Sequence, residues 1–112
     1  MKSKLNILWT SADPTTAEKM VLMYALNSKV ENWWDEVQLI IWGASAGLVN
    51  DDIFIQGLIS ELIEHGVHVT ACQVCADMVG ARETFKELGI ELIYWGEPLT
   101  EILKSDGKLL TI

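Results

Sequence analysis

The amino-acid sequence predicts an α/β domain with three layers, in which a mostly parallel five-stranded sheet lies between helices. Five short apolar runs rich in Ile, Leu and Val alternate with helix-like segments along the 112 residues. The run at residues 37–42 is almost continuously apolar, which is typical of a strand covered on both faces. Strands that alternate with helices indicate a mostly parallel sheet, and the length of the chain indicates one domain over residues 1–112.

The expected strands all end close to a turn-forming or helix-starting residue. They comprise residues 5–9, 37–42, 67–71, 90–95 and 108–112. The sequence does not specify their order in the sheet.

The expected helices are bounded by start and stop signals. The first follows Asp13 as N-cap, begins at Pro14 and extends to about residue 29. The others begin near residues 50–52, 76 and 98. They are followed by Gly66, Gly89 and Gly107. Glycine is the usual residue where a helix ends in a left-handed conformation.

Composition and charge exclude several classes of function. The net charge of −8 opposes binding to the phosphate backbone of nucleic acids. The apolar run near the N-terminus is too short for a signal peptide, and no stretch of about 18 apolar residues is available to span a membrane. We therefore expect a cytosolic protein with reduced thiols. Nine aromatic residues, five of them Trp, favour a homo-oligomer with apolar surface at its interfaces.

Three expected strands end in tryptophan, at Trp9, Trp42 and Trp95. Because the carboxyl ends of parallel strands share one edge, we expect these side chains to gather near Cys72, which follows the third strand. Ligands bind at that edge in open parallel sheets. The three tryptophans then either wall a pocket or cap the core. The nearby loops carry Ser11, Ser45 and Glu97, which ordinary turn and cap chemistry also explains.

Cys72 and Cys75 are the only cysteines, and their spacing allows several interpretations. His65 and His68 precede the third strand, about 13 Å from its end, so a metal site built from all four residues is not expected. A four-thiolate site shared by two chains stays open. A structural disulfide is not expected in the reducing cytosol, and it would add little stability because it closes a very short loop.

The remaining interpretations are a working thiol and a dithiol. Cys72 lies at a strand-to-helix turn, where the helix dipole and free N–H groups favour a thiolate. Cys75 lies one turn further and is either a resolving thiol or a buried core residue. A thioredoxin-like dithiol has this spacing, but Gln73 and Val74 replace the usual Gly-Pro. We expect no cofactor, because neither residues 10–18 nor residues 42–47 form a nucleotide-binding loop.

Nearly the whole chain resembles the DsrE/DsrF-like family, which includes sulfur-relay subunits of sulfur oxidation and of tRNA thiolation. The likeness rests on LNILWTSADPTTAEKMVLMYAL, VQLIIWGAS, GVHVTACQVCADMVG and LGIELIYWGEPLTEIL. Cys72, with Gly80 eight residues later, matches the position of the sulfur-accepting cysteine in that family. Cys75 is a departure from the one-cysteine motif.

The resemblance implies a trimer or hexamer that receives a persulfide and passes it to a protein or a small acceptor. The leading hypothesis is a cytosolic sulfurtransferase-like carrier, with Cys72 as nucleophile and backbone N–H groups near Val74 and Cys75 stabilising its thiolate. One alternative is a binding module whose Trp-rich edge holds a small ligand or a partner protein. The other is a dithiol redox protein.

Overall fold

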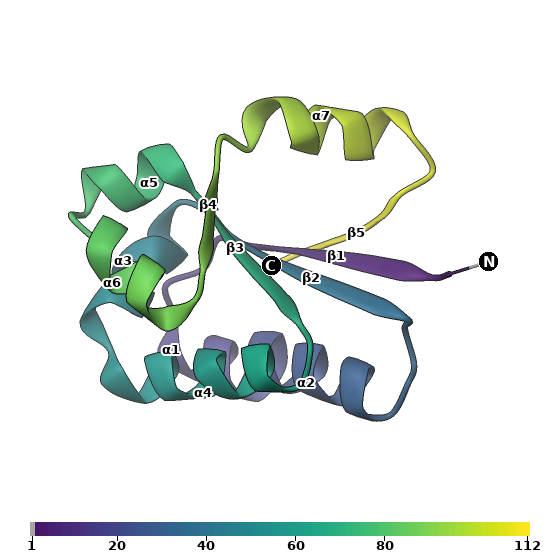
Figure 1. Cartoon of the computed structure of the whole chain (residues 1–112), viewed down its shortest axis with the longest axis horizontal. Coiled ribbons are helices and arrows are strands. Elements are labelled where there is room, and N and C mark those ends of the chain that lie inside the picture. Colours follow the sequence, from purple (N-terminus) through teal and green to yellow (C-terminus); the bar gives the residue numbers. More distant parts are fainter. Residues whose placement is uncertain (1) are drawn as a thin grey trace.

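Five parallel strands form one sheet in the order β4-β3-β2-β1-β5 in the computed structural model, which describes residues 2–112 (Figure 1). The strands are β1 (Lys4–Trp9), β2 (Glu36–Ile41), β3 (His68–Cys72), β4 (Glu91–Ile93) and β5 (Lys108–Thr111). The predicted α/β fold with a five-stranded parallel sheet is confirmed, and every strand is parallel to its neighbours.

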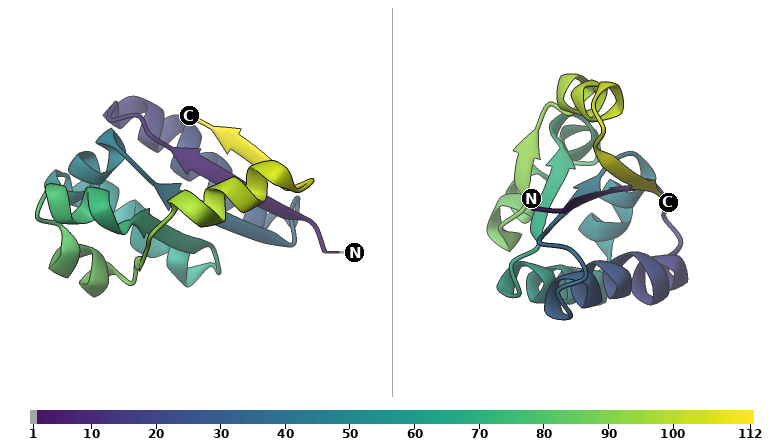
Figure 2. Two further views of the ribbon diagram at one scale, coloured as in Figure 1. Left: turned by 90° about the horizontal axis from the view of Figure 1, so that it is seen from above. Right: turned by 90° about the vertical axis from the view of Figure 1, so that its right-hand side faces the viewer.

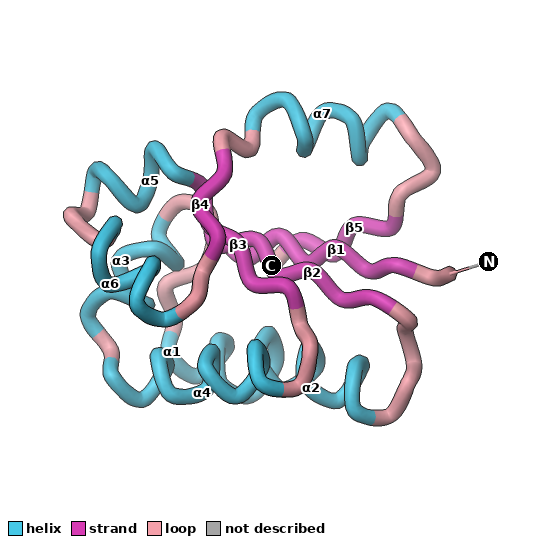
Figure 3. Tube along the Cα trace, viewed as in Figure 1, coloured by secondary structure: helices cyan, strands magenta, loops and turns pink. Residues whose placement is uncertain are grey.

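Helices occupy every connection between consecutive strands (Figure 3). They are α1 (Pro14–Thr16), the π-helical segment η1 (Ala17–Leu22), α2 (Met23–Val30), α3 (Ala44–Asp51), α4 (Ile53–Glu64), α5 (Gln73–Met78), α6 (Arg82–Leu88) and α7 (Gly96–Lys104). The first three join into one run that starts as predicted, because the Asp13 carboxylate accepts from the Thr16 N–H at 2.8 Å.

The helices are divided unequally between the two faces of the sheet. Figures 1 and 2 show α2 and α4 packed side by side below the sheet, while α7 alone crosses above it. The strand order explains the difference. Each step from β1 through β4 moves to the adjacent strand, whereas α7 carries the chain back across the sheet to β5 at the far edge. Right-handed crossovers therefore place α7 on the opposite face.

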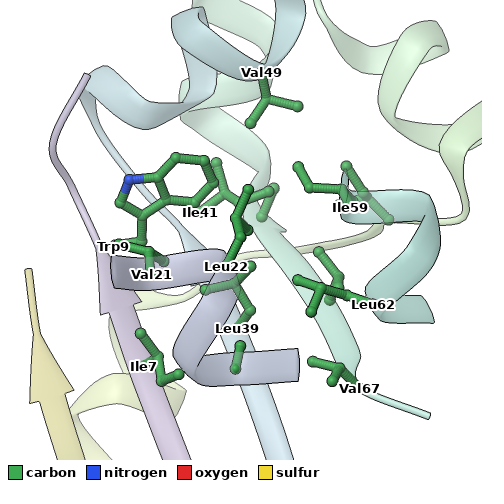
Figure 4. Close-up of a cluster of buried hydrophobic side chains, with 14 of the residues drawn as sticks. Ile7, Trp9, Val21, Leu22, Leu39, Ile41, Val49, Ile59, Leu62 and Val67 are labelled. Carbon is green, nitrogen blue, oxygen red and sulfur yellow. The ribbon is translucent and has the colours of Figure 1, made fainter. Parts of the chain in front are cut away.

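The hydrophobic core lies between the sheet and the larger helical layer. Alternate residues of the strands point to this side, and Figure 4 shows Ile7, Trp9, Leu39 and Ile41 among the side chains buried there. Strand side chains alternate between faces with a period of two residues, so the intervening residues point to the face crossed by α7.

On the face of the sheet crossed by α7, buried polar side chains form hydrogen-bonded pairs. Asn6 and Gln38 are both buried, and the Gln38 amide donates to the Asn6 side-chain oxygen at 2.8 Å. Asn6 in turn donates to the Lys108 carbonyl oxygen at 3.2 Å. These bonds satisfy polar groups that burial would otherwise destabilise.

Three details of the predicted helices are wrong. Residues 44–51 form α3, because a positive φ of 72° at Gly43 turns the chain out of β2 into a helix instead of a loop. The expected single helix over residues 76–88 is two helices, since Gly80 adopts a φ of 70° between them. Gly107 is not a left-handed cap. Instead, the Ser105 hydroxyl accepts from the Gly107 N–H and donates to the Ile102 carbonyl oxygen, and these two bonds close the end of α7.

The caps predicted at Gly66 and Gly89 are present, with φ values of 92° and 88°. Across residues 2–112, no helix has both the length and the apolar character needed to cross a membrane.

Candidate functional site

Cys72 is the last residue of β3 and also the N-cap of α5, so the chain passes from strand to helix without a loop. It pairs with Ile93 of β4 in the register of the sheet. Its side chain is 6% exposed. The thiol therefore lies at the carboxyl edge of the sheet, close to the surface but largely screened from water.

Cys75 lies in the first turn of α5, beside Cys72. Its Sγ accepts a hydrogen bond from the Gly43 N–H at 3.3 Å. Sequence reasoning missed Gly43 as part of this site, since residues 42–47 were judged only as a nucleotide loop. The sequence offered a glycine directly after the end of an expected strand, but only the strand order places this residue beside Cys75 at the carboxyl edge.

The two thiols influence each other. Both cysteines are free. Burial raises the pKa of the Cys75 thiol; the Gly43 N–H opposes that rise, and hydrogen bonding and charge at Cys72 add to it. Cys75 therefore keeps its proton at neutral pH, and it can donate a hydrogen bond to its neighbour when Cys72 is ionised.

The predicted tryptophan rim does not form. Trp9 is fully buried and points into the core under the helical layer, so the expectation that it walls a pocket is wrong (Figure 4). Trp95 is also buried but lies on the other face of the sheet, where its indole N–H donates to the Thr70 hydroxyl at 3.1 Å. Trp42 is half-buried. The sequence indicated a shared edge, but the alternation of faces separates Trp9 from Trp95.

The predicted serines contribute to structure at this edge. Ser45 is fully buried; its hydroxyl donates to the Trp9 carbonyl oxygen at 2.6 Å and accepts from the Trp42 N–H at 3.1 Å. It thus ties the ends of β1 and β2 together and holds the turn that carries Gly43. Ser11 is partly exposed, and its hydroxyl accepts from the Asp13 N–H at 3.1 Å, which stabilises the turn before α1.

Glu97 lies apart from the thiol pair, in the first turn of α7. Together with Trp95 and Gln38 it lines a groove of about 730 Å³ between α7 and the sheet. Neither cysteine lines this groove. Of the sequence-predicted site residues, the two cysteines form the thiol pair, Trp95 and Glu97 line the groove, and Trp9 lies in the core.

The histidines lie far from the thiols, as expected. His68 begins β3 and pairs with the Glu91 carboxylate, while His65 follows α4. Within residues 2–112, no group of three or more His, Cys, Asp or Glu side chains is placed to hold a metal ion.

Comparison with solved structures identifies a relative that covers nearly the whole chain. It is the conserved protein of unknown function BT1422 from Bacteroides thetaiotaomicron, with a TM-score of 0.96 and 44% sequence identity. The match covers 98% of this chain and 95% of that one. The chain belongs to the same protein family as BT1422.

A second solved structure, the ychN protein from E. coli, shares the fold of this BT1422-family chain. It has a TM-score of 0.71 at 20% identity, and the match covers 100% of both chains. No protein-family model and no curated protein matches the sequence.

Proposed function

We propose that this protein is a small cytosolic sulfur-relay protein of the DsrE/DsrF-like type, which carries a persulfide on Cys72. The observation that carries the proposal is the position of this thiol. It ends a strand at the carboxyl edge of a parallel sheet, leads directly into a helix, and has a second thiol and a backbone N–H close by. The whole-chain likeness to ychN supports the fold on which this proposal depends.

The chemistry needs only the thiolate of Cys72 and a persulfide donor. The thiolate attacks the outer sulfur of the donor and forms a new S–S bond with it. The S–S bond of the donor breaks, and the rest of the donor leaves as a thiolate that takes up a proton. A hydrogen bond from the protonated Cys75 stabilises the attacking thiolate before the reaction. Partial burial of Cys72 then protects the persulfide from water and oxidants.

The surface beside the thiols suits a protein donor or acceptor. Val74 and Met78, which follow Cys72 on α5, are 50% and 80% exposed. Exposed apolar side chains next to a reactive group favour protein docking over free diffusion of a small molecule. We expect the protein itself to be a homo-oligomer, either a trimer or a hexamer.

Intact-mass spectrometry after incubation with glutathione persulfide tests the proposal. The Cys75→Ser variant, which keeps Cys72, should gain one reversible adduct of about 32 Da per chain, the mass of one sulfur. The Cys72→Ser variant should gain none. Uptake of sulfur by Cys72→Ser, or its absence from Cys75→Ser, would overturn the proposal.

A second candidate function is ligand or partner binding without thiol chemistry, and the groove beside α7 favours it. This groove joins an aromatic wall, Trp95, to polar groups from Gln38 and Glu97, a combination typical of small-molecule sites. Thiol reactivity distinguishes the two functions. If Cys72 alkylates no faster than a model thiol at neutral pH, the binding function is favoured.

The third candidate, a dithiol redox protein, is favoured by two free thiols three residues apart, of which Cys72 raises the pKa of Cys75. It requires a disulfide between Cys72 and Cys75 that forms and is reduced reversibly.

A further inference from the structure

The carriage of a persulfide by Cys72 uses Cys75 only as a hydrogen-bond donor and gives Gly43 no role. We propose that Cys75 is a resolving thiol that discharges the Cys72 persulfide, releasing its outer sulfur as hydrosulfide and leaving a Cys72–Cys75 disulfide. This step rests on the proposed function and adds an activity to it, since the protein would then reduce sulfane sulfur as well as carry it.

The backbone places the two cysteines at the same end of one short helix. Cys72 caps α5 and Cys75 is its third residue, so they stand three apart at the start of one helical turn. Residues at this spacing are close neighbours on a helix, at about 5–6 Å between Cβ atoms. A disulfide needs Cβ atoms about 3.5–4.5 Å apart, so a small shift of the first turn of α5, together with rotation of the two side chains, closes the bond.

Gly43 holds the resolving thiol in place. Its N–H donates to Cys75 Sγ at 3.3 Å, and its φ of 72° is a conformation that L side chains rarely adopt. Ser45 bonds both Trp9 and Trp42, so the turn that carries this N–H is tied to the ends of two strands. A donor on such a turn stays in position while negative charge develops on Cys75.

The step balances without an external oxidant. Cys75 loses its proton to solvent, and its sulfur attacks Sγ of Cys72, the inner sulfur of the persulfide. The bond between Sγ and the outer sulfur breaks, and its electron pair leaves with the outer sulfur as hydrosulfide. The outer sulfur is reduced by two electrons, which the two thiols supply by becoming a disulfide. A dithiol reductant, of the thioredoxin class, must then restore both thiols.

Loading with sulfur activates this step. In the unloaded protein, charge on the Cys72 sulfur adds to burial in raising the pKa of Cys75. When the outer sulfur of the persulfide carries its proton, no charge lies on the Cys72 sulfur, while the Gly43 N–H still favours the Cys75 thiolate. The resolving thiol therefore becomes easier to ionise once there is a persulfide to resolve.

The test follows mass and hydrosulfide together in the absence of oxygen. The native protein and the Cys75→Ser variant are loaded with glutathione persulfide and desalted. The native protein should then release one hydrosulfide per chain and end about 2 Da lighter than its reduced form, the loss expected for a disulfide. The variant should keep the adduct of about 32 Da and release no hydrosulfide above a blank without protein.

A glycine pair supplies the control for the role of Gly43. An added Cβ finds open space at both Gly43 and Gly47, but only Gly43 has a positive φ. Gly43→Ala disfavours the φ of 72° and should move the N–H away from Cys75. Hydrosulfide release should then slow about tenfold, the smallest factor expected for loss of a hydrogen bond to a charged group. Gly47→Ala, inside the helix that Gly43 precedes, should release hydrosulfide at the native rate.

The outcomes separate this step from the proposed function. If Cys75→Ser takes up no sulfur, both are overturned. If that variant is loaded but the native protein keeps its persulfide, only the resolving step fails. The step also fails if the native protein and Cys75→Ser release hydrosulfide at equal rates, or if the disulfide forms without hydrosulfide.

Discussion

At the scale of single residues, Thr70 shows how one hydroxyl group joins three parts of the sheet. It is fully buried in β3, donates to the Leu39 carbonyl oxygen of β2 at 2.9 Å, and accepts from the Trp95 indole after β4. Trp95 is thereby held on the face opposite to Trp9. The role of each tryptophan is decided by the face to which it points, and not by its position at the end of a strand.

Thr70→Val should lower the free energy of unfolding by about 1–3 kcal/mol, because valine keeps the shape but leaves the buried Trp95 N–H without an acceptor. Urea denaturation measures the difference. Thr111→Val, at the exposed end of β5, is the matched control and should change stability by less than about 0.5 kcal/mol. Equal stability of the two variants would contradict the role of the Thr70 hydroxyl.

At the scale of elements, the short helices at the carboxyl edge assemble the thiol pair. The turn from β2 into α3 supplies the Gly43 N–H, and the turn from β3 into α5 supplies both sulfurs. Neither turn contains a flexible loop. The α3 helix is followed at once by α4, whose start is defined by the Asp52 carboxylate.

Asp52→Ala should destabilise the protein by about 1 kcal/mol, the usual effect of losing an N-cap. The Asp52 side chain accepts from the N–H groups of Phe54 and Ile55 at 3.0 and 3.1 Å, and alanine would leave both without this partner. Thermal or urea unfolding checks the value. Asp51→Ala removes the neighbouring carboxylate, which caps no helix, and a comparable loss in that variant would argue against the cap.

At the scale of the whole molecule, the strand order leaves one face of the sheet with a single helix. Large apolar side chains are also exposed at several places, and they include Trp33, Ile53, Phe54, Met78, Tyr94 and Leu103. Apolar surface of this kind is usually covered in an assembly.

We therefore expect a homo-oligomer, with a solution mass that is a multiple of 12.5 kDa, three or six chains being the expected numbers. Analytical ultracentrifugation over a range of concentrations measures this mass. A monomer at all concentrations would contradict the expectation, while leaving the chemistry of the thiol pair untouched.

The sequence by itself determined the five strands, the parallel sheet and the position of Cys72 at its carboxyl edge. These features follow from local apolar runs and from glycine and proline signals, which act over a few residues. It did not predict α3, because the chain enters this helix through a positive φ at Gly43, which local patterns do not specify. The expectation that Trp9 walls a pocket was also wrong. The sequence predicts where a strand ends, but it does not predict which face of the sheet the last side chain points to.

Only the tertiary structure decided which residues meet. The contact between Gly43 and Cys75 joins residues 32 positions apart, and it exists because β2 and β3 are neighbours in the sheet. Strand order depends on the packing of all the helices at once, so no local pattern contains it. For the same physical reason, Glu97 lies in a groove away from the thiols, although the strand that precedes it, β4, also ends at the carboxyl edge.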